Sequence, residues 1–192
     1  MNDAQIRRQP AALPHIVSDT NAMAFTMSSE VKVGALLAAL AASKPHGRVL
    51  ELGTGTGHGT AWLLAGMDAA STLDTVDADD QVVSVARRHL GGDARVTFHV
   101  IDGAAFLRSG EAPFDLIYAD AWPGKFSHLD DALALLQPGG IYVIDDLLPQ
   151  PNWPDGHAPK VPALIDDIER RAEFATVRLA WASGLMLVVR RA

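Results

Sequence analysis

Acidic residues and glycines recur in this sequence where short apolar runs stop. A run at residues 49–52 contains Glu51 and leads into three alternate glycines, Gly53, Gly55 and Gly57. Later runs stop at carboxylates, namely Asp77, Asp102, Asp120 and the consecutive Asp145 and Asp146. Glycine accepts positive φ and lets a ligand approach the backbone without meeting a Cβ. Carboxylates can accept hydrogen bonds from hydroxyl groups or hold a hard cation such as Mg²⁺. These residues therefore indicate a ligand site, provided that the fold brings the ends of the runs together.

The apolar runs have the length of buried strands. A run of about four to eight apolar residues is typical of a strand that is covered on both faces. Such strands are predicted at residues 49–52, 72–77, 96–101, 114–119 and 141–144. Strands that alternate with helices indicate a parallel sheet with helices on both sides. Because ligands of these sheets lie outside the carboxyl ends of the strands, the acidic residues should share one edge.

The segments between these strands have helical patterns. Apolar stripes predict helices near residues 33–41, 61–65, 82–90, 103–107, 129–136 and 161–168. Ser28 or Ser29 can cap the first helix, and Pro138 with the two glycines after it should end the fifth. Two last strands, at residues 175–181 and 185–189, are predicted to form a hairpin around Ser183 and Gly184.

Two segments have no regular period. Residues 1–28 contain Pro10 and Pro14 and are interpreted as a loosely helical arm, which we expect to order over the ligand pocket or against a second subunit. Five prolines between residues 149 and 162 predict a stiff irregular loop. This loop follows the fifth strand, so its Asn152, Trp153 and His157 are placed to cover a substrate; a passive surface excursion is the alternative.

The predicted fold class is α/β. We expect one doubly wound, Rossmann-like domain over residues 1–192, with a seven-stranded, mostly parallel sheet and an antiparallel C-terminal hairpin strand. The net charge of −7 argues against nucleic acid as the main partner. The absence of cysteine excludes disulfides and thiolate metal sites. The longest apolar run, at residues 33–42, is too short to span a bilayer, so a cytoplasmic protein with no membrane partner is expected.

The glycine spacing distinguishes two nucleotide-type cofactors. A dinucleotide fingerprint requires G-x-G-x-x-G, but His58 or Thr60 occupies the third glycine position, depending on where the count begins. The pattern present, E-x-G-x-G-x-G, resembles the first motif of class I S-adenosylmethionine-dependent methyltransferases. Asp77, twenty residues after Gly57, is placed to accept both ribose hydroxyl hydrogens. The alternative role for Asp77 is to cap the helix that follows, but Asp79 or Asp80 would suit that cap better. A structural turn without a ligand is the alternative for the glycines.

A second resemblance involves the last two acidic strand ends. The segment Asp120-Ala-Trp122, together with Asp145 and Asp146, resembles magnesium-dependent O-methyltransferases of the catechol and caffeoyl-CoA type. It implies that Asp120, Asp145 and Asp146 hold Mg²⁺ and that Trp122 flanks adenine. Because Asp145 and Asp146 are consecutive, both can serve only if the strand ends at Asp145 and the chain turns there.

The same resemblance implies the remaining cofactor contacts. Asp102 follows the third strand, where the family recognises adenine, and capping of a short helix is the alternative role for it. Including the N-terminal match at Met27 and Ser28, the predicted cofactor-binding residues are Met27, Ser28, Glu51, Gly53, Thr54, Gly55, Gly57, His58, Asp77, Ala78, Asp102, Gly103, Ala104, Asp120 and Trp122.

The chain departs from that family at two positions. Asp146 stands where the family has asparagine, and Pro123 stands where catechol-type enzymes have the lysine that takes the substrate proton. Lys125 is the nearest lysine, so Lys125 and Asp120 are the catalytic candidates.

The predicted function is S-adenosylmethionine-dependent O-methylation of a small molecule, with Mg²⁺ as an assisting ion and a homodimer as the expected assembly. The alternatives are a metal-free N-methyltransferase or aminopropyltransferase, an NAD-dependent dehydrogenase, and a non-catalytic cofactor-binding protein.

Overall fold

Seven strands form one mixed sheet in the part of the chain that the computed structural model describes, residues 5–110 and 113–192. The strands are β1 (Arg48–Leu52), β2 (Thr72–Asp77), β3 (Val96–Val100), β4 (Phe114–Ala119), β5 (Leu136–Ile144), β6 (Phe174–Leu179) and β7 (Leu185–Arg190). Their order is β3-β2-β1-β4-β5-β7-β6. The first five strands pair in parallel, whereas β7 pairs antiparallel with both β5 and β6. The predicted mostly parallel sheet with an antiparallel end is confirmed.

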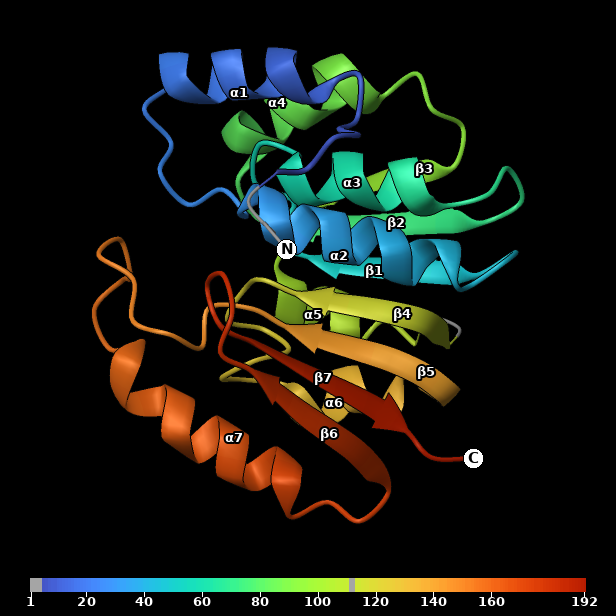
Figure 1. Cartoon of the computed structure of the whole chain (residues 1–192), viewed down its shortest axis with the longest axis vertical. Coiled ribbons are helices and arrows are strands. Elements are labelled where there is room, and N and C mark those ends of the chain that lie inside the picture. Colours follow the sequence, from blue (N-terminus) through green and yellow to red (C-terminus); the bar gives the residue numbers. More distant parts are fainter. Residues whose placement is uncertain (1–4, 111–112) are drawn as a thin grey trace.

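Helices cover both faces of this sheet (Figure 1). One side carries α1 (Leu13–Ala22), α2 (Val31–Ala42), α3 (His58–Gly66) and α4 (Asp80–Leu90), and the other carries α5 (Gly103–Leu107), α6 (Leu129–Ala134) and α7 (Val161–Glu169). A short 3-10 helix, η1 (Ala158–Lys160), precedes α7. The residues of β1 alternate between the two hydrophobic clusters, with Val49 in one and Leu50 in the other. The central strand is therefore buried on both faces, as its unbroken apolar run predicts.

The carboxyl ends of β1, β4 and β5 lie at the same edge of the sheet, at the left in Figure 1. In β4 and β5 the register joins Ala119 to Ile144, the last residues of these strands. Asp120 and Asp145 follow directly, so the parallel pairing places them next to each other. The edge that the acidic residues were predicted to share is present.

Two local predictions were wrong. Strand β5 begins at Leu136 and not at residue 141, because Pro138 and Gly139 lie within an irregular stretch of the strand where the register with β4 shifts. Gly139 has φ +76° there, so the glycine bends the strand and does not end a helix. The N-cap residue of α2 is Glu30, without a side-chain hydrogen bond, and neither Ser28 nor Ser29 caps it.

The N-terminal arm packs onto the rest of the molecule. Its first four residues lie outside the described residues, and α1 forms over residues 13–22. Ile16 is fully buried, and the Thr20 hydroxyl lies 2.8 Å from the Thr56 hydroxyl in the glycine-turn segment. Asp19 accepts a hydrogen bond from Arg88 and pairs with His89 at the end of α4. The arm is therefore attached beside the predicted site. Among the described residues, no helix is long and apolar enough to cross a membrane.

Candidate active site

The turn between β1 and α3 is a tight backbone structure that requires glycine. Gly53, Gly55 and Gly57 have φ values of +104°, +51° and +95°. A Cβ on Gly53 would lie only 2.8 Å from the Asp120 carbonyl oxygen, and one on Gly57 would lie 2.8 Å from the Ala86 Cβ. These glycines therefore let the turn pack directly against the end of β4 on one side and against α4 on the other.

Glu51 supports this turn from beneath. Its side chain is completely buried, and one carboxyl oxygen accepts hydrogen bonds from Thr60 (2.5 Å) and Thr75 (2.6 Å). Burial raises the pKa of Glu51 to about 7, and the two threonine hydroxyls oppose that shift only in part. With no exposed surface, Glu51 is placed to fix the turn, so the structure does not support a direct contact between Glu51 and a cofactor.

A cavity of about 170 Å³ opens beside the turn, at the ends of β1, β2 and β3. Five predicted cofactor residues line it, namely Gly53, Asp77, Ala78, Asp102 and Gly103. The remaining wall is mostly apolar and is formed by Leu52, Val76, Ala121 and Pro123. Apolar walls with a few placed polar groups are typical of sites that take a nucleoside.

Asp77 and Asp102, the two acidic residues of this cavity, make different local hydrogen bonds. The Asp77 carboxylate accepts hydrogen bonds from the backbone N–H groups of Gly55 (2.8 Å) and Asp79 (3.0 Å), which fixes its orientation. Asp79 caps α4, so Asp77 is not needed as the cap. Asp102 caps α5 through the Ala105 N–H, which was the alternative predicted for it. Ala104 is buried within α5, so its side chain lies under the cavity wall. Asp77 is therefore the better-placed partner for ribose hydroxyls.

A shallow hollow lies on the other side of the glycine turn, under the arm. Thr54, Gly55 and His58 line it from the turn, and Phe25, Met27, Ser28 and Ser29 line it from the arm. The Phe25 ring lies 3.5 Å from the position of a Cβ on Gly55. The Asn152 side-chain amide donates a hydrogen bond to the Thr26 carbonyl oxygen, which joins the arm to the proline-rich loop. The prediction that the arm orders over the pocket is confirmed for its described residues.

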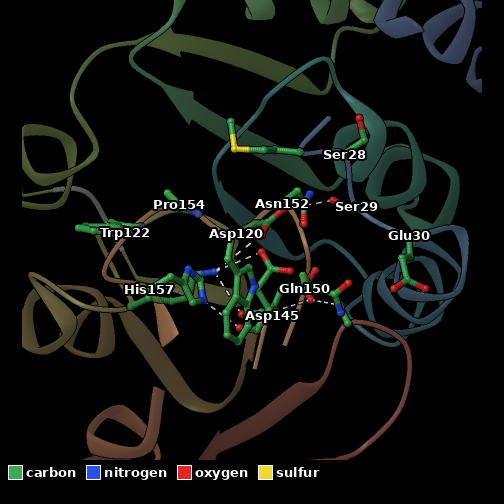
Figure 2. Close-up of a pocket in the computed structure, with 15 residues that line it drawn as sticks. Ser28, Ser29, Glu30, Asp120, Trp122, Asp145, Gln150, Asn152, Pro154 and His157 are labelled. Carbon is green, nitrogen blue, oxygen red and sulfur yellow. Dashed lines mark hydrogen bonds and ion pairs between the residues drawn. The ribbon is translucent and has the colours of Figure 1, made fainter. Parts of the chain in front are cut away.

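The third hollow is an acidic cavity of about 210 Å³ between the arm, the ends of β4 and β5, and the proline-rich loop. Figure 2 shows Asp120 and Asp145 in its middle, with His157 beside them and Asn152 also lining the cavity from the loop. Trp153 stacks on His157 with a ring-centroid distance of 4.3 Å. The loop therefore lies over the acidic strand ends, and coverage of a substrate by Asn152, Trp153 and His157 stays a prediction.

Asp145 is the buried centre of a hydrogen-bond network. One carboxylate oxygen accepts from the Tyr118 hydroxyl at 2.6 Å, and the other accepts from the Ser183 hydroxyl and from the Asp146 N–H. Strand β5 ends at Ile144, and Asp146 has φ +61°, so the chain turns immediately after Asp145. The turn required by the predicted use of both carboxylates is present. The three donors leave Asp145 fixed in place.

Lys125 reaches into the same cavity and is 2% exposed. Its ammonium donates a hydrogen bond to the Asp145 carbonyl oxygen at 3.1 Å. It lies 3.8 Å from the Asp120 carboxylate and 4.0 Å from the Asp146 carboxylate. Burial and the neighbouring carboxylates raise the pKa of Asp120 well above its usual value, and Lys125 opposes that shift. Lys125 and Asp120, the two catalytic candidates, are thus brought together.

The predicted magnesium site is not formed. No group of three or more histidine or acidic side chains is placed to hold a metal ion within residues 5–110 and 113–192. The Lys125 ammonium lies between Asp120 and Asp146, where the ion would have to be. Both oxygens of Asp145 already accept hydrogen bonds. Asp120, Asp145 and Asp146 converge as predicted, but a lysine cation and protein donors occupy them, so the residues do not fit the ion.

Trp122 also differs from its predicted role. Trp122 is 40% exposed and lines the margin of the acidic cavity (Figure 2). The Lys160 ammonium lies 5.3 Å from the centroid of its ring. Ala121 and Pro123 form the wall next to Asp102 and Gly103 instead. Sequence reasoning missed Tyr118 and Ser183, which lie in apolar strand and hairpin contexts that gave no signal of a site.

The sequence profile of a methyltransferase domain family matches residues 50–147, about half of the chain. The match begins within β1 and ends just after Asp146, so it contains the glycine turn and every acidic strand end described above. The chain belongs to this methyltransferase family. The match excludes the arm and the proline-rich loop, which are the segments that lie over the site.

Other members resemble the chain in sequence and in structure. A putative O-methyltransferase of Mycolicibacterium vanbaalenii is 33% identical over 120 residues, covering 58% of this chain and 52% of that protein. The chain thus spans about half the length of the curated relatives it matches. A putative O-methyltransferase from Klebsiella pneumoniae is 26% identical, with a TM-score of 0.84 over 97% of this chain and 93% of that one. The O-methyltransferase TomG from Streptomyces achromogenes, solved in complex with S-adenosylmethionine, is 23% identical, with a TM-score of 0.82 over 99% of this chain and 94% of that one.

Proposed function

We propose that this protein transfers a methyl group from S-adenosylmethionine to an oxygen of a small molecule. The observation that carries the proposal is the arrangement of the three hollows. Gly53 lines both the cavity at the ends of β1, β2 and β3 and the hollow under the arm, and Asp120 lines both that hollow and the acidic cavity. The three therefore adjoin in the order that an adenosine, an amino-acid chain and an acceptor would require.

The residues present fit this cofactor. Asp77 offers an oriented carboxylate for the ribose, the Phe25 ring lies against Gly55, and Met27 and Ser28 line the hollow next to Asp120. When bound, the cofactor supplies a sulfonium-activated methyl group. The chain then has to hold the acceptor oxygen in line and exclude water, because orientation accounts for much of the rate of such a transfer.

The acidic cavity is suited to that task. Asp120 and Lys125 present polar atoms where it meets the cofactor hollow, and Trp122 and Trp153 provide aromatic walls for the rest of the acceptor. The loop and the arm, joined through Asn152, cover the opening. Magnesium, predicted from the sequence, has no role in this proposal, because its donor set is occupied. A small-molecule acceptor, a cytoplasmic location and a homodimer stay predictions.

Methyl transfer from labelled S-adenosylmethionine to a panel of phenols, alcohols and amines tests the proposal. We expect methyl ethers as products; methylated amines alone would favour the N-methyltransferase alternative. A purified, folded chain that binds the cofactor but methylates no compound of the panel would favour a non-catalytic binding protein.

The variant Asp77→Ala should weaken cofactor binding by roughly 1–3 kcal/mol, because it strands the ribose hydroxyls. Asp79→Ala is the matched control, since it removes a carboxylate two residues away whose role is to cap α4. If both variants bind equally well, Asp77 has no role in the site.

A further inference from the structure

The acidic cavity contains a cation that belongs to the protein. We propose that the Lys125 ammonium replaces a divalent metal ion as the fixed positive charge of this cavity, and that the protein recruits no metal there. One part of this inference rests on the proposed function, namely that the ammonium would face the acceptor oxygen. The other part, that the ammonium takes the place of a metal ion, is tested by metal binding alone.

The position of Lys125 is set by a packed turn and not by a flexible surface loop. The Lys125 N–H donates to the Trp122 carbonyl oxygen, and the Gly124 N–H donates to that of Ser127. Gly124 has φ +90°, and a Cβ there would lie 2.5 Å from Leu52 and 2.7 Å from the Tyr142 hydroxyl. Tyr142 in turn donates to the Gly124 carbonyl oxygen at 2.7 Å. Gly124 is therefore held close against Leu52 and Tyr142, and the next side chain, Lys125, lines the cavity.

The surroundings of the ammonium match those of a bound cation. It contacts one carbonyl oxygen, that of Asp145, and lies within 4.0 Å of the Asp120 and Asp146 carboxylates. These are the hard oxygen donors that a magnesium ion prefers. Such a cluster of buried carboxylates is costly without a positive charge between them. Lys125 supplies that charge from within the chain.

The third carboxylate, that of Asp145, accepts hydrogen bonds from other groups of the protein. Asp145 accepts hydrogen bonds from Tyr118, Ser183 and the Asp146 N–H, so its oxygens are held by the protein. A metal ion would have to displace the ammonium and at least one of these donors together. An ammonium already close to the Asp120 and Asp146 carboxylates repels a second cation there, so Lys125 disfavours metal binding in this cavity.

Titration of the protein with Mn²⁺, followed by electron paramagnetic resonance, tests the inference directly. Wild type is compared with Lys125→Met and Lys125→Gln; the latter keeps a side chain that can donate to the Asp145 carbonyl oxygen. Lys160→Met is the matched control, because Lys160 lies over the Trp122 ring at the cavity margin and carries the same charge. Each titration is repeated with S-adenosylhomocysteine present.

We expect wild type and Lys160→Met to show no saturable Mn²⁺ binding, and the Lys125 variants to bind at least about tenfold more tightly, since a dication then relieves the repulsion of the bare carboxylates. Stoichiometric binding of Mn²⁺ to wild type at micromolar metal would overturn the inference. So would folded Lys125 variants that bind Mn²⁺ no better than Lys160→Met. If neither Lys125 variant folds, the wild-type titration decides alone. Failure to bind S-adenosylhomocysteine would count against the proposed function and leave the metal result standing.

Discussion

The two halves of the carboxyl edge are built in different ways. The cofactor half consists of the glycine turn and the ends of β2 and β3, and its Asp77 carboxylate is held by the backbone N–H groups of Gly55 and Asp79. The acceptor half depends on contacts made by side chains. There the Ser183 hydroxyl donates to Asp145, and the Asn152 amide donates to the Thr26 carbonyl oxygen across 126 positions. The first half is shaped mainly by backbone geometry, and the second mainly by side-chain packing.

Substitution of Gly53 should break the cofactor half with the largest effect. Gly53→Ala forces a Cβ into a residue at φ +104°, 2.8 Å from the Asp120 carbonyl oxygen. We expect it to lower the free energy of unfolding by about 2–4 kcal/mol, combining backbone strain with overpacking. Chemical denaturation measures the loss, and cofactor binding should fall with it.

Gly139→Ala is the control for that substitution. Gly139 also has positive φ, +76°, but no atom lies within 4 Å of its Cβ position. It should therefore show only the strain of the backbone, about 1–2 kcal/mol. Equal losses in the two variants would mean that the close approach of Asp120 to the turn has no energetic importance.

The buried acid beneath the turn should make stability depend on pH. Burial raises the pKa of Glu51 to about 7 in the folded protein, above the ordinary glutamate value of 4.5 that applies to the unfolded chain. Between these values the folded state binds the extra proton, so stability falls as pH rises through this window and levels off above it. The shift corresponds to about 3 kcal/mol. Glu51→Gln should lack this slope in denaturation measured from pH 4.5 to 8; a variant with an unchanged slope would assign the proton to another group.

Tyrosine substitutions sharpen the comparison in the acceptor half, with a smaller expected effect. Tyr118 donates to the Asp145 carboxylate, whereas Tyr142 donates to the neutral Gly124 carbonyl oxygen. Both side chains are fully buried. Tyr118→Phe should cost about 1.5–3 kcal/mol of stability, and Tyr142→Phe about 0.5–1.5 kcal/mol, because hydrogen bonds to charged groups are stronger. A larger loss in Tyr142→Phe would contradict the view that the Asp145 carboxylate is the stronger of the two hydrogen-bond acceptors.

The sequence predicted the cofactor half more fully than the acceptor half. Glycine spacing and strand ends are local signals, so the turn and the place of Asp77 followed from the printed residues. The end of β5 and the turn at Asp146 were also anticipated. The start of β5 was not anticipated, because Pro138 and Gly139 are typical of a helix end. In the structure they lie inside the strand, where its register with β4 shifts.

In the acceptor half the sequence identified the residues but not their partners. Asp120, Asp145 and Asp146 do converge, and Lys125 lies among them. The side chain that occupies the centre depends on the packing of Gly124 against Leu52 and Tyr142, which no local pattern shows. A metal was therefore predicted where the fold places an ammonium. Trp122 was misplaced for the same reason, since the path of the turn decides which face its ring meets.

Calorimetric titration with S-adenosylhomocysteine and, separately, with NAD tests the central claim most directly. The glycine spacing, the oriented Asp77 and the three adjoining hollows predict that one S-adenosylhomocysteine binds per chain and that NAD produces no binding heat. Measurable binding of NAD with none of S-adenosylhomocysteine or S-adenosylmethionine would contradict the account.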